Sequence, residues 1–366
     1  MLGGMGNSVS WETAERVATW VGAGSPPFGT APRPLDQATR ESLDEDFELA
    51  TRRAEELVVA ATGLVPKSGP ARAKVVDRSG WVRGNLSSFR HLLDPVLERL
   101  ETTSMPGPLA AAARNVTGAQ LGVVLGWMST RVLGQYDVLI AEGDHDGDVV
   151  SYVGPNIVAL ERRHGFPPSQ FRLWIALHEV AHRCQFTGVP WLRDHFLKLV
   201  DEGLSTMTPD PKRFIDALRR ATDAVRRGQN PLEEAGVLGL VAPPEQMAVI
   251  RQIQAMMTLL EGHGDITMDR AAPEEVTEAP RFASALRERR KKANAPARLL
   301  QQLTGIDAKM RQYQQGEHFI ESVEAIGGPE LLARVWEGPE QLPTADEIKR
   351  PELWVSRVGP PKVATG

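Results

Sequence analysis

Apolar residues recur at the three- and four-residue spacing of amphipathic helices along most of the chain. A few short stretches are instead continuously apolar and β-branched, which is typical of buried strands. We expect strands at residues 74–76, 138–140 and 149–153, with residues 157–162 extending the same sheet. The pattern predicts helices over residues 11–21, 35–62, 86–100, 108–133, 167–188, 191–207, 243–263, 281–303 and 307–325.

Interruptions in this pattern predict a mainly α protein of the α+β type, organised in three parts. Residues 1–35 hold the first helix and a Gly/Pro-rich connector. Residues 36–165 form a lobe of helices with the small sheet, and residues 166–366 form a helical lobe. The prolines after residue 338 predict a tail that wraps the surface.

The uncharged residues 115–130 are the best candidate for a membrane segment, but they are shorter than the ~20 residues that a bilayer requires. Gly118, Gly122 and Gly126 recur there at four-residue spacing. We expect a buried helix pressed closely against a neighbour, with a membrane helix as the alternative.

Composition narrows the classes of protein. The chain has 366 residues, a hydrophobic content of 42% and a net charge of -5 with both signs interspersed. We therefore expect no nucleic-acid and no membrane partner. The one cysteine, Cys184, permits no intrachain disulfide, and no signal peptide is evident, so we expect a cytoplasmic protein. The oligomeric state stays open.

A zinc-binding pattern lies in the helix predicted over residues 167–188, as His178-Glu179-Val180-Ala181-His182. Histidines four residues apart project from one face of a helix, so both imidazoles can bind one Zn²⁺. Glu179 is offset around the helix, where it can take a proton from a zinc-bound water as general base. The helix is apolar nearly all round, and a metal satisfies these polar groups better than a hydrogen-bonded core network.

A catalytic zinc needs a third protein ligand, and Glu261 is the first candidate. It lies on the apolar stripe of its predicted helix, so its carboxylate is expected to point inward. Asp265, one turn further, can accept a hydrogen bond from the free ring nitrogen of a zinc-bound histidine. Glu202, whose spacing from the motif is common in thermolysin-like enzymes, His263 and Asp265 itself are the alternative ligands.

Acyl transfer also needs a donor for the developing oxyanion. Tyr313 is the first candidate for this catalytic role and Tyr136 the second. The alternative for each is a buried tyrosine with an ordinary partner.

With these motifs in view, the chain resembles the zincin-like metallopeptidases of actinobacteria and related bacteria. Members of that family are often labelled as hydrolases associated with deazaflavin-coenzyme biosynthesis. This label describes an association and not a demonstrated reaction. The matching segments are DRSGWV (77–82), RVLGQYD (131–137), FRLWIALHEVAHRCQF (171–186), VPWLR (189–193), EGHGD (261–265), RQY (311–313) and LPT (342–344).

The resemblance implies a zincin-like fold in which a small sheet accompanies a helical bundle that carries the metal site. The wider gluzincin class implies a Glu-x-x-x-Asp element on the second metal helix, which Glu261 and Asp265 match. The gap from His182 to Glu261 is longer than in thermolysin-like enzymes, which indicates an inserted helical segment at about residues 208–240.

The chemistry of Glu179 favours a catalytic site, because a purely structural zinc site does not need it. The sequence therefore predicts a zinc-dependent hydrolase, a metallopeptidase in the first instance, in which Glu179 activates a zinc-bound water to attack an amide carbonyl of a peptide or small amide. The alternatives are a non-catalytic zincin-fold protein that binds metal or a partner, and a hydrolase of a small amide or ester.

Overall fold

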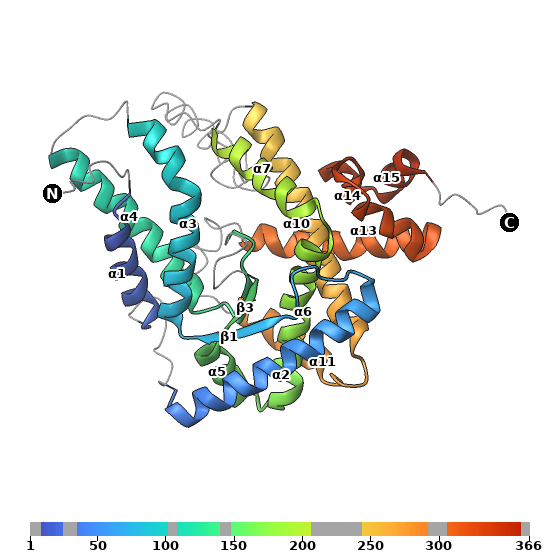
Figure 1. The fold of residues 1–366 in the computed structure, drawn as a ribbon, viewed down its shortest axis with the longest axis horizontal. Helices are drawn as coiled ribbons and strands as arrows, with labels where there is room; N and C mark the ends of the chain where they lie inside the picture. The colour runs from blue at the N-terminus through green and yellow to red at the C-terminus, as the bar shows by residue number, and fades with distance from the viewer. Residues whose placement is uncertain are drawn as a thin grey trace. The chain divides into compact units, whose positions relative to one another are not determined.

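The computed structural model describes residues 9–24, 35–101, 108–139, 148–205, 244–291 and 306–359. Helices dominate this part of the chain and accompany one three-stranded sheet (Figure 1), as the hydrophobic pattern predicts. No helix among the described residues is long and apolar enough to cross a membrane.

The chain forms two compact units, each built from separate segments. The first unit comprises Met1–Leu57, Gly69–Val180 and Ala272–Ala297, and the second comprises Val58–Ser68, Ala181–Ala271 and Arg298–Gly366. The three-part division drawn from the sequence stays a prediction.

The first unit contains the sheet and most of the N-terminal helices. The residues that form helices here largely match those expected, although α3 begins earlier, because Asp77 Oδ1 accepts a hydrogen bond from the Gly80 backbone nitrogen at 2.6 Å and caps it. The helices are α1 (Trp11–Gly22), α2 (Gln37–Thr62), α3 (Arg78–Glu101), α4 (Pro108–Ser129), α5 (Gly154–His164), α11 (Ala279–Lys291) and the first part of α6 (Pro168–Gly188).

The sheet has the order β1-β3-β2. The strand β1 (Arg72–Val76) runs parallel to β3 (Val149–Val153), and β2 (Gly134–Tyr136) runs antiparallel to β3. In this register Tyr152 lies between Val75 on β1 and Gly134 on β2. Tyr152 is fully buried, stacks on Phe47 of α2 at 4.0 Å between ring centroids, and its hydroxyl lies 2.7 Å from the hydroxyl of Thr51. These contacts fasten the sheet to α2.

Two of the strand predictions are wrong. The sequence predicts a strand over residues 138–140, but the described residues 138 and 139 follow a strand, because Asp137 Oδ1 accepts a hydrogen bond from the Leu139 backbone nitrogen at 2.9 Å and turns the chain. Residues 157–162 belong to helix α5. Pro155 suits its first turn, and Gly165 ends it in the left-handed conformation at φ 61°.

The glycine-spaced segment forms the predicted close helix packing. A Cβ on Gly118, Gly122 or Gly126 of α4 would lie within 2.5 Å of a backbone oxygen of Ser10, Ala14 or Ala18 respectively. The two backbones of α1 and α4 therefore approach at a distance that only glycine allows.

The second unit is helical. It holds the end of α2, the second part of α6, and the elements that follow. These are α7 (Leu192–Ser205), α10 (Pro244–Ala271), α13 (Ile306–Ala333), η1 (Arg334–Trp336), η2 (Pro339–Gln341), α14 (Ala345–Lys349) and α15 (Pro351–Val358). The expected inserted segment at residues 208–240 lies outside the described residues.

The C-terminal tail is not the surface strap that its prolines suggest. Trp354 of α15 is fully buried, and it packs in one core with Leu259 of α10 and Phe319, Val323 and Leu331 of α13. The prediction fails because Pro339 and Pro351 stand in the first turns of helices, where proline is tolerated.

Candidate metal centre

The helix α6 carries the histidine pair on its less buried side. Its apolar residues are buried as predicted, Phe171, Ala176 and Leu177 completely so, whereas His178 and His182 are half-buried. Both imidazoles are therefore partly accessible to solvent.

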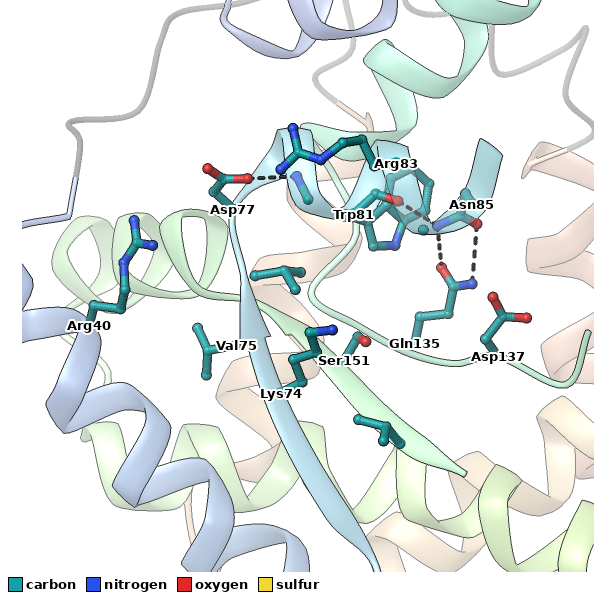
Figure 2. Close-up of a pocket in the computed structure, with 14 residues that line it drawn as sticks. Arg40, Lys74, Val75, Asp77, Trp81, Arg83, Asn85, Gln135, Asp137 and Ser151 are labelled. Carbon is teal, nitrogen blue, oxygen red and sulfur yellow. Dashed lines mark hydrogen bonds between the residues drawn. The ribbon is translucent and has the colours of Figure 1, made fainter. Parts of the chain in front are cut away.

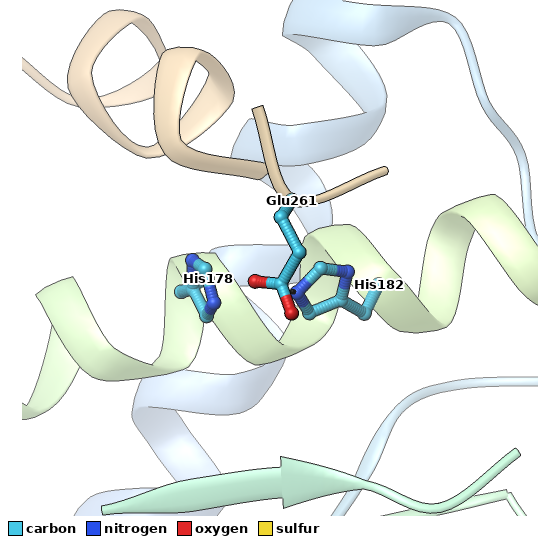
Figure 3. A group of neighbouring side chains, drawn as sticks. All are labelled: His178, His182 and Glu261. Atoms are coloured by element: carbon cyan, nitrogen blue, oxygen red, sulfur yellow. Dashed lines mark ion pairs between the residues drawn. The ribbon is translucent and has the colours of Figure 1, made fainter. Parts of the chain in front are cut away.

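Glu261 of α10 completes a cluster of three side chains with the two histidines. One potential ligand atom from each of His178, His182 and Glu261 lies within 4.8 Å of the others, and Glu261 Oε2 lies 3.6 Å from His182 Nε2. Figure 3 shows the Glu261 carboxylate directed toward the two imidazole rings. Among the described residues this is the one such group of three or more His, Cys, Asp or Glu side chains.

The donor set of this cluster fits a zinc ion. Two imidazoles and one carboxylate are the ligands of a known class of catalytic zinc sites. A tetrahedral zinc with bonds of ~2.0–2.2 Å holds its ligand atoms about 3.3–3.6 Å apart. The separation of 3.6 Å between Oε2 and Nε2 therefore matches two ligands of one ion. Glu261 is only 4% exposed, and a cation would offset the cost of burying its charge.

A close crossing of two helices positions Glu261. A Cβ on Gly262 of α10 would lie 2.4 Å from the carbonyl carbon of Gly316 on α13, and a Cβ on Gly316 would lie 2.2 Å from the Thr258 oxygen. Because neither glycine has a side chain, the two backbones touch on the side of α10 next to Glu261.

Gln185 is a residue of the site that the sequence analysis missed. It is completely buried one turn after His182 on α6, and its Oε1 lies 3.0 Å from His182 Nδ1. Its Nε2 donates to the Leu260 carbonyl oxygen at 3.0 Å and lies 3.0 Å from His263 Nδ1. The sequence does carry a signal for this contact. Gln185 follows the candidate ligand His182 by three residues on an apolar helix, a spacing at which two side chains can meet.

His263, an alternative third ligand, lies outside the cluster of three. It is 8% exposed, and its ring meets the Trp336 ring edge-on at 5.1 Å between centroids. Burial, and less strongly the nearby His182 and Arg270, lowers the pKa of His263 to about 4. This ring is therefore neutral at pH 7.

The two acidic alternatives also lie outside the cluster. Glu202 on α7 faces Lys198 with 3.8 Å between oxygen and nitrogen, and its side chain is 46% exposed. Asp265 is half-buried one turn after Glu261, and its predicted bond to a histidine stays a prediction. Cys184 is buried.

Glu179 lies against the edge strand β2. A Cβ on Gly134 would lie 2.6 Å from Glu179 Cγ and 2.9 Å from its Oε1. Burial raises the pKa of the Tyr152 hydroxyl well above its ordinary value, and the charge of Glu179 adds to this effect. Glu179 itself is half-buried. Its carboxylate therefore lies against the Gly134 backbone and is still accessible to water.

The two tyrosine candidates differ in what the structure describes. Tyr136 is half-buried at the end of β2. Tyr313 belongs to α13, but its side chain lies outside the described part of the structure.

A surface pocket of about 500 Å³ occupies the other side of the sheet, and it contains none of the predicted site residues. Lys74, Ser151 and Gln135 form one row across its floor. The Gln135 and Asn85 side-chain amides are paired by two hydrogen bonds of 3.2 Å (Figure 2). Successive residues of a strand face opposite sides, so Gln135 lines this pocket while Gly134 contacts Glu179.

With the fold and the cluster described, comparison with known proteins defines the class. Residues 9–355 match the zincin-like metallopeptidase family, and the chain belongs to that family. Membership implies a bound metal, typically zinc, and the cluster of His178, His182 and Glu261 fits that expectation.

The chain is also similar to a solved structure. A crystal structure from Chloroflexus aurantiacus, described as a provisionally assigned hydrolase with a novel fold, is 28% identical. The match covers 95% of this chain and 98% of that chain with a TM-score of 0.68. No curated protein matches. The family and the fold class predicted from the motifs are thus confirmed, whereas the actinobacterial and deazaflavin associations stay predictions.

Proposed function

We propose that this protein is a zinc-dependent hydrolase that cleaves the amide bond of a peptide, with His178, His182 and Glu261 as the zinc ligands. The observation that carries the proposal is the position of Glu179. It follows His178 directly on the ligand helix, is half-buried and contacts Gly134. A zinc site that only stabilised the fold would need no carboxylate at this position.

The roles follow from the chemistry of each group. A bound zinc ion would polarise the substrate carbonyl and lower the pKa of water. Glu179 takes a proton from the attacking water and returns it to the nitrogen of the leaving amine, as general base and then general acid. Gly134 leaves room for the Glu179 side chain and restricts its positions.

Tyr136 is the better supported candidate for the oxyanion donor. It follows Gly134 by two residues on β2, so both face the side of the sheet on which Glu179 lies. A hydroxyl on that side can donate a hydrogen bond to the oxygen of the attacked carbonyl. We therefore propose Tyr136 ahead of Tyr313, and Asp265 as a further support of the ligands.

Substitution of Glu179 tests this proposal. Glu179→Gln should keep stoichiometric zinc and lower the kcat for a peptide-library substrate by ~10²–10⁴-fold, since a general base contributes about this much. Glu202→Gln is the matched control, because Glu202 lies outside the cluster and faces Lys198. Mass spectrometry of the cleaved library measures both variants.

Other results would favour the competing functions. A zinc-loaded wild type that cleaves no library peptide but hydrolyses small amides or esters would restrict the substrate to that class. A wild type that holds zinc and hydrolyses neither class would contradict catalysis and favour a metal-binding or interaction protein. Our proposal includes no nucleic-acid or membrane partner.

A further inference from the structure

We propose that Gln185 is a positioning residue of the metal centre, which selects the nitrogen that His182 offers to the metal and ties this histidine to the helix that carries Glu261. The inference rests on the proposed function, because it assigns a role within the same site. It goes beyond that function by naming the side chain that positions both His182 and the backbone beside Glu261.

The contacts of Gln185 define how its amide is oriented. The Leu260 carbonyl oxygen can only accept a hydrogen bond, so the amide atom 3.0 Å from it must be the donor Nε2. The opposite atom, 3.0 Å from His182 Nδ1, must then be the acceptor Oε1.

This orientation determines the tautomer of His182. Since Oε1 accepts, Nδ1 must carry the proton and donate. Nε2 of the neutral ring then keeps its lone pair, and this is the atom that lies 3.6 Å from Glu261 Oε2. The hydrogen bond that His182 Nδ1 donates to Gln185 Oε1 thus leaves Nε2 as the ligating nitrogen and directs it toward the metal position. A carboxylate or backbone carbonyl performs this task at other histidine ligands.

The same amide holds the second ligand. Leu260 immediately precedes Glu261, so the bond to its carbonyl fixes the α10 backbone beside the carboxylate. The Nε2 group also lies 3.0 Å from His263 Nδ1, and the His263 ring is itself held against Trp336. Gln185 is completely buried, so no water competes for these bonds.

Zinc affinity of substituted proteins tests the role of Gln185. Gln185→Met keeps the length of the side chain and removes its hydrogen bonds. We expect zinc to bind ~10–100-fold more weakly, the usual loss when a partner of a metal ligand is removed, and the visible spectrum of the Co²⁺-loaded protein to change. Competition with a chelating indicator measures the affinity.

A glutamine on the same helix supplies the matched control. Gln170 of α6 accepts hydrogen bonds from Thr277 Oγ1 at 3.2 Å and the Glu278 nitrogen at 3.1 Å, and it lies away from the ligands. Gln170→Met also removes side-chain hydrogen bonds from α6, but it should leave zinc affinity and the Co²⁺ spectrum unchanged.

A second variant keeps the test decisive if Gln185→Met does not fold. Gln185→Glu still accepts from His182 Nδ1 but cannot donate to the Leu260 oxygen, so its zinc affinity should fall between those of the wild type and Gln185→Met. Wild-type zinc affinity and an unchanged Co²⁺ spectrum in either Gln185 variant would overturn the inference while leaving the proposed function intact. Failure of the wild type to bind zinc would instead overturn the proposed function.

Discussion

Gly134 lies so close to Glu179 that a single methyl group on its Cα would come within 2.6 Å of the glutamate Cγ. Gly134 pairs with the buried Tyr152 on the central strand, so β2 has little freedom to yield. The position of the proposed general base therefore depends on the absence of a side chain on another element.

Gly134→Ala should separate catalysis from metal binding. The added methyl group must displace the Glu179 side chain, and a misplacement of about 1 Å can cost ~10²-fold in rate. We expect kcat for peptide hydrolysis to fall by about that factor while zinc stays stoichiometric, as measured by steady-state kinetics and elemental analysis. Gly84→Ala is the control, because no atom lies within 4 Å of the corresponding Cβ on α3. Equal activity of both variants would contradict the role of this contact.

Glu261→Ala should abolish tight zinc binding. The substitution removes one of three proposed ligands and leaves two histidines, so the loss of affinity should exceed the ~10–100-fold that indirect partners contribute. Equilibrium dialysis against zinc measures it. Glu202→Ala serves as the control for the alternative ligand, and a greater loss of zinc in that variant would transfer the assignment to Glu202.

The metal-free protein should lose stability as the pH falls from about 6.5 to about 4. Burial lowers the pKa of His263 from 6.5 to about 4, so in this range the unfolded state binds the proton more strongly than the folded state. The contribution of the neutral His263 ring to the free energy of unfolding is complete above pH 6.5 and is lost below pH 4. It amounts to ~3 kcal/mol at most. Urea unfolding at several pH values measures the slope. His263→Gln should flatten it, whereas identical slopes in both proteins would refute the assignment.

Gly122→Ala should destabilise the first unit without touching the metal centre. The new Cβ would lie 2.5 Å from the Ala14 oxygen and 2.8 Å from Val17 Cβ, which forces α1 and α4 apart. Overpacking of this kind typically costs ~1–3 kcal/mol. Chemical denaturation should show that loss, with Gly84→Ala again as the exposed helical control, and zinc affinity should not change. A variant as stable as the wild type would show that the helices can separate freely.

The amino-acid sequence predicts the local parts of this site well. A spacing of four residues on a continuous helix places His178 and His182 on one face whatever the rest of the chain does. Glu261 could be found because it shares the inward stripe of a long amphipathic helix, and it does come within reach of the histidines.

Contacts between distant segments are what the sequence could not predict. The amide of Gln185 matters through the Leu260 carbonyl, a backbone atom without any sequence signature. Gly134 affects the site because it contacts Glu179 of α6, a helix that follows in the chain only after β3 and α5. The misplaced strand and the misread C-terminal tail share another cause, since an Asx turn at Asp137 and prolines in first helical turns look like ordinary breaks in a hydrophobic pattern.

The crossing of Gly262 and Gly316 makes the part of the chain from α13 onward an integral part of the proposed metal centre. Because α13 touches the α10 backbone with no side chain in between, a truncated protein that ends before α13 would expose the peptide groups beside Glu261 to solvent. The residues up to Trp354, buried in the core that holds α13, would then be needed for a fragment to retain zinc. A minimal fragment that keeps the proposed site should therefore retain the chain through Trp354.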